Sequence, residues 1–292
     1  MRLSEQKRAL ATAVAAARAA GRVMRRNLRA SKAINSQTQH DIKLELDVRC
    51  QRIIQQRLLR AFPGTALLGE EGVAGDPGSR LRWVVDPIDG TVNFTYGIPH
   101  SCVCIALQIA EQAKSRGKLV RKSHRAAGRA SSGFRTLLGV VYDPFQDELW
   151  TALRGQPARL NGDVIHVSDR RGLGEALISL GFGNSPGALE HTLEAVNALA
   201  LKVRKLRLMG SAGLAMAYVA CGRFDAFVEA GVRLWDITAG GLILECAGGE
   251  FWHRQLPGDH VFEINANNGR LRRALALITR MKQRAQPRRG TR

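Results

Sequence analysis

The chain of 292 residues is predicted to adopt an α/β fold. Hydrophobic residues make up 45% of the sequence, which is enough apolar surface to offset the chain entropy lost on folding. Segments with helical spacing of apolar residues alternate along the whole chain with short apolar runs that are typical of buried strands. No apolar run approaches the ~18–20 residues of a membrane span, so we expect no insertion into a membrane.

Residues 1–32 predict an amphipathic helix with a cationic face. Its apolar positions recur three or four residues apart, at Leu10, Val14, Ala17, Gly21, Met24 and Leu28. An Arg-rich, acid-poor transit peptide is the alternative interpretation. The presence of Glu5 and the small residues of the apolar stripe favour a helix that packs inside the fold.

The rest of the chain predicts a mixed succession of elements. A helix is expected over 46–59, and the run 81–85 predicts a buried strand that leads directly into a polar turn at 86–91. Further strands are predicted at 102–109, 137–142, 148–152 and 176–180. Further helices are predicted at 189–199, 211–221 and 236–247, the last two ended by Gly222 and Gly248 in the usual C-terminal cap position.

Basic residues outnumber acidic ones by 44 to 25, a formal net charge of +19. Three segments, 1–32, 111–135 and 270–292, contain 26 of the basic and two of the acidic residues, so the rest of the chain has a net charge of −5. Weak, non-specific binding of polyanions is therefore expected of these segments and not of the body of the protein. An RNA- or transcription-complex-binding protein that uses them is the functional alternative of a different class.

The five cysteines are odd in number, scattered, and include no C-x-x-C pair. This usage disfavours a disulfide scaffold or a zinc site and favours a reducing, cytoplasmic compartment. Cys102 and Cys104 fall on one face of a predicted strand and are interpreted as core residues.

Acidic residues concentrate in two places, Gly69-Glu70-Glu71 and Asp86-Pro87-Ile88-Asp89-Gly90-Thr91, with Asp236 far downstream. A strand that ends in an Asp-x-x-Asp turn can direct two carboxylates and the intervening carbonyl into one space. Oxygen ligands in this arrangement suit a hard divalent cation such as Mg²⁺. An isolated turn of this composition would more simply be a solvated surface turn.

The spacing of several motifs resembles that of the inositol monophosphatase family. The run W-V-V-D-P-I-D-G-T-V-N-F at 83–94 follows G-E-E at 69–71 and precedes W-D-I-T-A-G at 235–240 and E-x-A-G-G at 245–249. The resemblance covers residues 9–270 and leaves out the insertion near 111–135 and the basic helix and tail at 271–292. It implies a layered αβαβα sugar-phosphatase fold with subdomains at about 1–180 and 181–270, and commonly a homodimer.

The resemblance also implies Mg²⁺-dependent hydrolysis of a phosphate monoester by two cations. Glu70, Asp86 and the carbonyl of Ile88 match ligands of a first Mg²⁺, and Asp86, Asp89 and Asp236 match ligands of a second. The matching catalytic residues are Thr91 and Asp47, which orient and deprotonate water, together with Glu70. A third Mg²⁺ ion is the alternative to two. Leu44 and Ser36 replace a hydroxyl residue and a lysine that are usual in the family, which argues against a contribution of this segment to such an ion.

Substrate contacts are transferred in the same way. The backbone N–H groups of Gly90 and Thr91 are expected to hold the phosphate beside the metal ligands Ile88, Asp89 and Asp236. Family-matched pocket residues are Gly210, Ser211, Ala212 and Glu229, the last accepting hydrogen bonds from polyol hydroxyls. Ser211 and Asp236 could instead be only helix N-caps. The expected substrate is myo-inositol 1-phosphate, with fructose 1,6-bisphosphate, histidinol phosphate and a nucleotide 3′-phosphate as alternatives.

Overall fold

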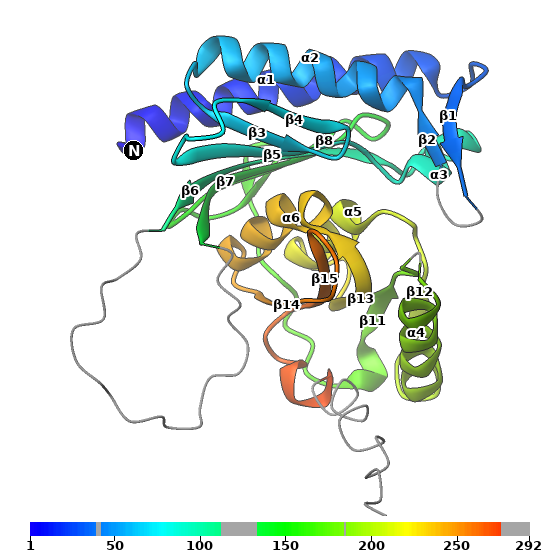
Figure 1. Ribbon diagram of the computed structural model, residues 1–292. Coiled ribbons are helices and arrows are strands. Elements are labelled where there is room, and N and C mark those ends of the chain that lie inside the picture. The colour runs from blue at the N-terminus through cyan, green and yellow to red at the C-terminus, as the bar shows by residue number, and fades with distance from the viewer. Residues whose placement is uncertain (39–41, 112–132, 184, 276–292) are drawn as a thin grey trace, which may run out of the picture.

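Helices and sheets alternate in five layers in the computed structural model of the chain (Figure 1). The structure describes residues 1–38, 42–111, 133–183 and 185–275. Two long helices cover an eight-stranded sheet, a second pair of helices lies between that sheet and a five-stranded one, and one more helix covers the smaller sheet's far face. The predicted α/β class and the αβαβα layering implied by the resemblance are confirmed.

The larger sheet has the strand order β10-β9-β8-β7-β6-β5-β3-β4. β3 and β5 pair in parallel, and the other described neighbours pair antiparallel. The parallel pair matters for function because it brings the carboxyl ends of two strands side by side. The strands are β3 (Ala66–Gly69), β4 (Gly72–Gly75), β5 (Leu81–Asp89), β6 (Cys102–Ala110), β7 (Phe134–Asp143), β8 (Glu148–Leu153), β9 (Arg159–Leu160) and β10 (Asp163–Val164).

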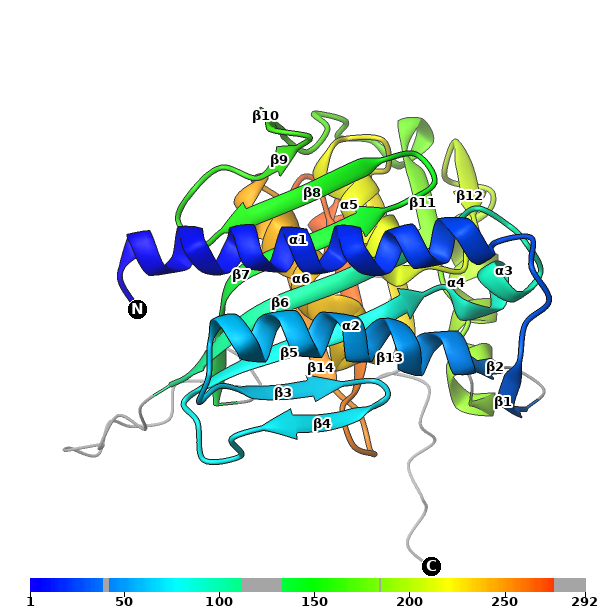
Figure 2. The same ribbon diagram turned by 90° about the horizontal axis from the view of Figure 1, so that it is seen from above.

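The outer face of this sheet is covered by α1 (Leu3–Asn27) and α2 (Glu45–Ala61), which lie side by side in Figure 2. The short hairpin β1 (Ile34–Gln37) and β2 (Ile42–Leu44) connects them. α1 buries mainly small side chains, which allows the helix to approach the sheet closely: Ala9, Ala13, Ala16, Ala17, Ala20 and Met24. The predicted N-terminal helix is confirmed as a packed part of the fold. No helix within the described ranges is both long and apolar enough to cross a bilayer.

The smaller sheet has the strand order β12-β11-β13-β15-β14. Its strands are β11 (Leu177–Leu180), β12 (Lys205–Arg207), β13 (Ala226–Arg233), β14 (Glu250–Gln255) and β15 (Val261–Asn267). α5 (Ala212–Ala220) and α6 (Leu234–Cys246) lie between the sheets, and α4 (Pro186–Leu199) lies on the far face. These three helices and β11 confirm the prediction, whereas β12 to β15 were not predicted. Gly222 and Gly248 follow α5 and α6 with φ of 74° and 90°, as expected of helix C-termini.

The prediction of a polar turn at 86–91 is wrong for its first four residues, because β5 continues through Asp89. Pairing with β6 joins Asp86 to Cys104 and Asp89 to Cys102, so three steps along β5 match two along β6. This irregularity accommodates Pro87, which has no N–H to donate to β6. The bulge also directs the two aspartates to the end of the sheet. A short helix, α3 (Thr91–Thr95), follows immediately.

The basic insertion expected near 111–135 interrupts the β6–β7 hairpin. Ala110 pairs with Phe134 and Ile109 with Arg135, so the last two residues of the expected insertion belong to β7. Residues 112–132 and 276–292 lie outside the described ranges. Binding of polyanions by the insertion and the tail therefore stays a prediction.

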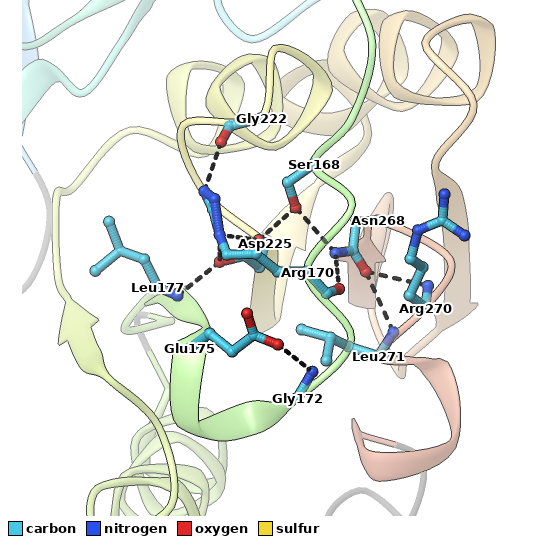
Figure 3. Close-up of polar contacts among 10 residues, drawn as sticks. All are labelled: Ser168, Arg170, Gly172, Glu175, Leu177, Gly222, Asp225, Asn268, Arg270 and Leu271. Atoms are coloured by element: carbon cyan, nitrogen blue, oxygen red, sulfur yellow. Dashed lines mark hydrogen bonds and ion pairs between the residues drawn. The ribbon is translucent and has the colours of Figure 1, made fainter.

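Residues 165–176 cross from the larger sheet to the smaller one, whose first strand begins at Leu177, shortly before the division expected at 180. The crossing is held by Asp225, a fully buried residue just before β13 (Figure 3). Its carboxylate accepts hydrogen bonds from the hydroxyl of Ser168, from Arg170 Nε at 3.1 Å and from the backbone N–H of Leu177 at 2.7 Å. Asn268 donates to Ser168 Oγ and to the carbonyl of Arg170, and so fastens the same segment to the end of β15.

We predict that Asp225→Ala destabilises the protein by about 2–4 kcal/mol, because it leaves the partly exposed Arg170 guanidinium and two further donors without their buried acceptor. The matched control is Asp169→Ala, which removes an ion pair to Arg270 from a side chain that is 90% exposed. The control should change stability by no more than about 1 kcal/mol. Urea unfolding of both variants measures the difference, and equal losses would contradict the assignment.

Candidate active site

A cavity of about 860 Å³ opens where the larger sheet meets α5, α6 and β13. It receives the carboxyl end of β5, the residue after β3, the start of α3, and the N-terminal ends of α5 and α6. All but one of the predicted site residues line it: Glu70, Asp86, Ile88, Asp89, Gly90, Thr91, Gly210, Ser211, Ala212, Glu229 and Asp236. Segments far apart in the sequence thus converge as expected.

Glu70 and Asp86 are brought together by the parallel pairing of β3 with β5. Gly69 is opposite Val85 in the register, and the backbone N–H of Glu70 donates to the carbonyl of Val85 at 3.2 Å. Glu70 and Asp86 are therefore each the residue that follows the Gly69–Val85 pair. The Asp86 carboxylate accepts the N–H of Ile88 at 3.0 Å, which shapes the bulge that places the Ile88 carbonyl beside Thr91.

Asp89 connects the end of β5 to the N-terminus of α5. Its carboxylate accepts hydrogen bonds from the Ser211 hydroxyl at 2.5 Å and from the backbone N–H groups of Ala212 at 3.2 Å and Gly213 at 2.7 Å. Unpaired N–H groups at a helix start favour a carboxylate there. Burial raises the pKa of Asp89, and these hydrogen bonds oppose the rise. Ser211 also caps α5, because its side chain accepts the N–H of Leu214.

Asp236 is not the N-cap of α6, as one interpretation of the sequence had it. The helix begins at Leu234 with Arg233 as its cap, and Asp236 occupies the third helical position. From there its carboxylate accepts the backbone N–H of Arg233 at 2.7 Å. Asp236 lines the cavity. Arg233 also lines the cavity, and its guanidinium donates to the carbonyl of Asp259.

The acids of the cavity perturb one another. Burial raises the pKa of Asp86 well above its ordinary value, and the charges of Glu70, Asp89 and Asp236 raise it further. Burial, followed by Asp89 and Glu70, has the same effect on Asp236. Burial, followed by Asp89, raises the pKa of Glu229 to about 8. Carboxylates that are held this close while buried repel one another, so the arrangement favours a cation between them.

The turn after β5, Gly90 and Thr91, lines the cavity. Gly90 has a left-handed φ of 90° and caps α3, and a Cβ there would lie 3.0 Å from the carbonyl of Gly210. Glycine is therefore required both by conformation and by the close approach of the Gly210 loop. The Thr91 hydroxyl donates to the carbonyl of Ile88 at 2.8 Å, which orients it toward the predicted metal ligands.

Asp47 is the predicted site residue that is absent from the lining of the cavity. It occupies the third position of α2, is 2% exposed, and accepts the backbone N–H of Leu44 at 2.8 Å. A capping role in α2 is thus established by geometry. The partnership with Thr91 that the resemblance implies stays a prediction.

Two further polar residues of the site were not predicted. Lys43, on β2, lines the cavity and approaches Glu71 at 3.5 Å. Asn93, within the D-P-I-D-G-T-V-N-F motif, donates to the carbonyls of His100 at 2.9 Å and Met209 at 2.8 Å. Asn93 thereby fixes the Gly210 loop against α3. The position of Asn93 within the motif was the signal that could have identified it as a site residue. No sequence signal pointed to Lys43.

Comparison with known proteins gives a consistent result. The family model described as "Inositol monophosphatase family" matches residues 5–115 and 133–281. The unmatched residues between these ranges fall within the basic insertion. A protein named Nus factor SuhB from Xylella fastidiosa is 37% identical over 248 residues, covering 84% of this chain and 81% of its own. A protein named inositol monophosphatase from Mesembryanthemum crystallinum is 37% identical over 247 residues, covering 82% and 83%.

Solved structures agree with this result. The extragenic suppressor protein SuhB from Bartonella henselae superposes with a TM-score of 0.77 at 32% identity, covering 92% of this chain and 97% of that one. The inositol monophosphatase from Anabaena gives a TM-score of 0.75 at 28% identity, with coverage of 93% and 95%. The matches extend over both sheets and the helices between them. The chain therefore belongs to the inositol monophosphatase family.

Proposed function

We propose that this phosphatase hydrolyses the phosphate monoester of a small polyol, with myo-inositol 1-phosphate as the substrate of choice, and that it requires two Mg²⁺ ions. The observation that carries the proposal is the convergence of four carboxylates on one cavity, from the end of β3, from β5 and from α6. The two on β5, Asp86 and Asp89, are buried, and Glu70 and Asp236 are half-buried. A phosphate monoester carries two negative charges. An acidic cavity can accept it only when cations neutralise the charges of the carboxylates and of the phosphate.

The residues present fit that requirement. Glu70, Asp86 and the Ile88 carbonyl would hold one cation, and Asp86, Asp89 and Asp236 the other. This set contains only oxygen donors, which Mg²⁺ prefers. Burial and, after it, mutual repulsion raise the pKa of Asp86 and Asp236, and a bound cation would offset both effects. When bound, such cations lower the pKa of water and stabilise the departing alkoxide.

The protein's own groups would position the reactants. The N–H groups of Gly90 and Thr91 would receive phosphate oxygens at the start of α3. The Thr91 hydroxyl, oriented by its contact with the Ile88 carbonyl, would position the attacking water. A threonine hydroxyl is a poor base, so a carboxylate such as Asp47 would act behind it as the final proton acceptor.

Glu229, which lines the same cavity, supports a polyol as the substrate. Glu229, on β13, has a pKa raised to about 8, so it is largely protonated at pH 7 in the absence of cations and can both donate to and accept from a hydroxyl. The cavity volume of about 860 Å³ lies within the range for small-molecule sites. Relatives named inositol monophosphatase support a cyclic polyol. Fructose 1,6-bisphosphate and histidinol phosphate form the comparison set of a substrate panel.

We expect phosphate release from myo-inositol 1-phosphate to require Mg²⁺ and to fall at least about 100-fold in Asp86→Asn. Without divalent cations the variant should be no less stable than the wild type, because it removes a buried carboxylate from a repelling cluster. Mg²⁺ should then stabilise the wild type more than the variant. The control is Asp143→Asn, which changes a buried aspartate of β7 away from the cavity. Equal stabilisation of the Asp86 variant by Mg²⁺ would refute the ligand assignment.

Thr91→Ala should lower kcat by about 10²–10⁴-fold and leave Mg²⁺ affinity nearly unchanged, because the hydroxyl acts on water and not on a cation. Thr95→Ala is the matched control, since Thr95 is a threonine of the same helix that donates to the carbonyl of Thr91. Steady-state kinetics and Mg²⁺ titration separate the two effects. A loss that is confined to KM would instead make Thr91 a substrate-binding residue.

A further inference from the structure

Two thiols lie directly behind the acidic cavity. Cys102 and Cys104 are two residues apart on β6, fully buried, and their sulfur atoms are 3.7 Å apart. Cys102 Sγ is also 3.4 Å from Asp89 Oδ2. The sequence interpretation of both residues as core is confirmed by their burial. It does not explain why the two sulfurs face a carboxylate in an otherwise apolar layer.

One ligand atom from each of Asp89, Cys102 and Cys104 lies within 4.8 Å of the other two. A Cβ at Gly213 would lie 2.5 Å from Cys104 Sγ, 2.9 Å from Asp89 Oδ2 and 3.0 Å from Cys102 Sγ. Only glycine is therefore compatible with the three ligand atoms in this arrangement.

The spacing between the ligand atoms also agrees with tetrahedral coordination. Two sulfurs bound at about 2.3 Å and separated by a tetrahedral angle lie about 3.8 Å apart, and a sulfur and an oxygen about 3.6 Å apart. The structure has 3.7 Å and 3.4 Å for the corresponding pairs. Little rearrangement of the side chains is therefore needed to place an ion between them.

We propose that Asp89, Cys102 and Cys104 form a binding site for a thiophilic divalent cation of the zinc and cadmium class. Binding forms two metal–sulfur bonds and one metal–oxygen bond, and the two thiol protons pass to solvent. Soft thiolate ligands select such ions over Mg²⁺, which prefers oxygen. The Ser211 hydroxyl, 3.7 Å from Cys102 Sγ, or a water molecule completes the coordination.

Occupancy of this site has a consequence that rests on the proposed function. Asp89 is a ligand in both sets, so a thiophilic ion that takes its Oδ2 weakens the second Mg²⁺ site. Asp89 and Ser211 line the cavity and contact Cys102, so the cavity floor is the route by which an ion reaches the thiols. The protein should therefore be inhibited by low concentrations of Zn²⁺ or Cd²⁺ even when Mg²⁺ is abundant.

The test uses Cd²⁺ alone as the probe on the full chain, because thiolate coordination gives an ultraviolet sulfur-to-metal charge-transfer band. Wild type should show a band that saturates, and Cys102→Ala and Cys104→Ala should each lower the Cd²⁺ affinity by more than the ~10–100-fold that loss of an outer-shell partner costs. Cys246→Ala, which removes a partly buried thiol elsewhere, is the control and should keep the band. Cys104→Ser replaces Cys104→Ala should the latter fail to fold.

No band in the wild type, or a band that persists in the Cys104 variant, overturns the proposal. Inhibition is measured separately, relative to the activity of each variant without Cd²⁺, and should be weaker in the Cys104 variant than in the Cys246 control. The absorbance readout does not depend on activity. A failure of the proposed phosphatase reaction therefore leaves the test of this site intact.

Discussion

The contact between the Asp89 carboxylate and the first turn of α5 fixes the end of β5 against the helix layer that separates the two sheets. Asp89 is the last residue of β5 in the larger sheet, and α5 packs against the smaller sheet. Three hydrogen bonds from Ser211, Ala212 and Gly213 join them at distances of 2.5 to 3.2 Å. Because both partners are buried, the orientation of this carboxylate is fixed, and with it the distance between the acids of β5 and those of β13 and α6.

The same contact creates an electrostatic problem that binding of cations would relieve. It holds Asp89 near Asp86, Asp236 and Glu229, each of which has its pKa raised by burial and by its neighbours. A protein that only needed stability would replace such a cluster with apolar residues. Its presence, together with backbone donors at Gly90 and Thr91, is best understood as a site prepared for cations and an anionic substrate. The thiols behind Asp89 extend that ligand set to softer ions.

The local part of this arrangement was predictable from the sequence. The Asp-x-x-Asp segment, the preceding Glu70 and the helix cap at Ser211 each carry signals within a few residues. The contact of Asp89 with Ser211 carries none, because the residues are 122 positions apart. β15 was missed although its signal was present, because Phe262, Ile264 and Ala266 alternate with Glu263, Asn265 and Asn267. The alternation alone does not show that these polar residues are buried as well. The end of β5 was misplaced because a bulge, which sequence rules do not anticipate, absorbs Pro87.

The pH dependence of unfolding, with and without Mg²⁺, tests most directly whether the buried acids form a cation site. A carboxyl whose pKa is higher in the folded than in the unfolded protein stabilises the fold at low pH, and this contribution is lost as pH rises through the folded pKa. For the proposed ligands Asp86 and Asp236 that window begins at the ordinary value of 3.8 and extends well above it. The stability gained on adding Mg²⁺ should therefore increase with pH across this window, because the cation favours the ionised carboxylates. A gain that is absent or independent of pH would contradict the cation site.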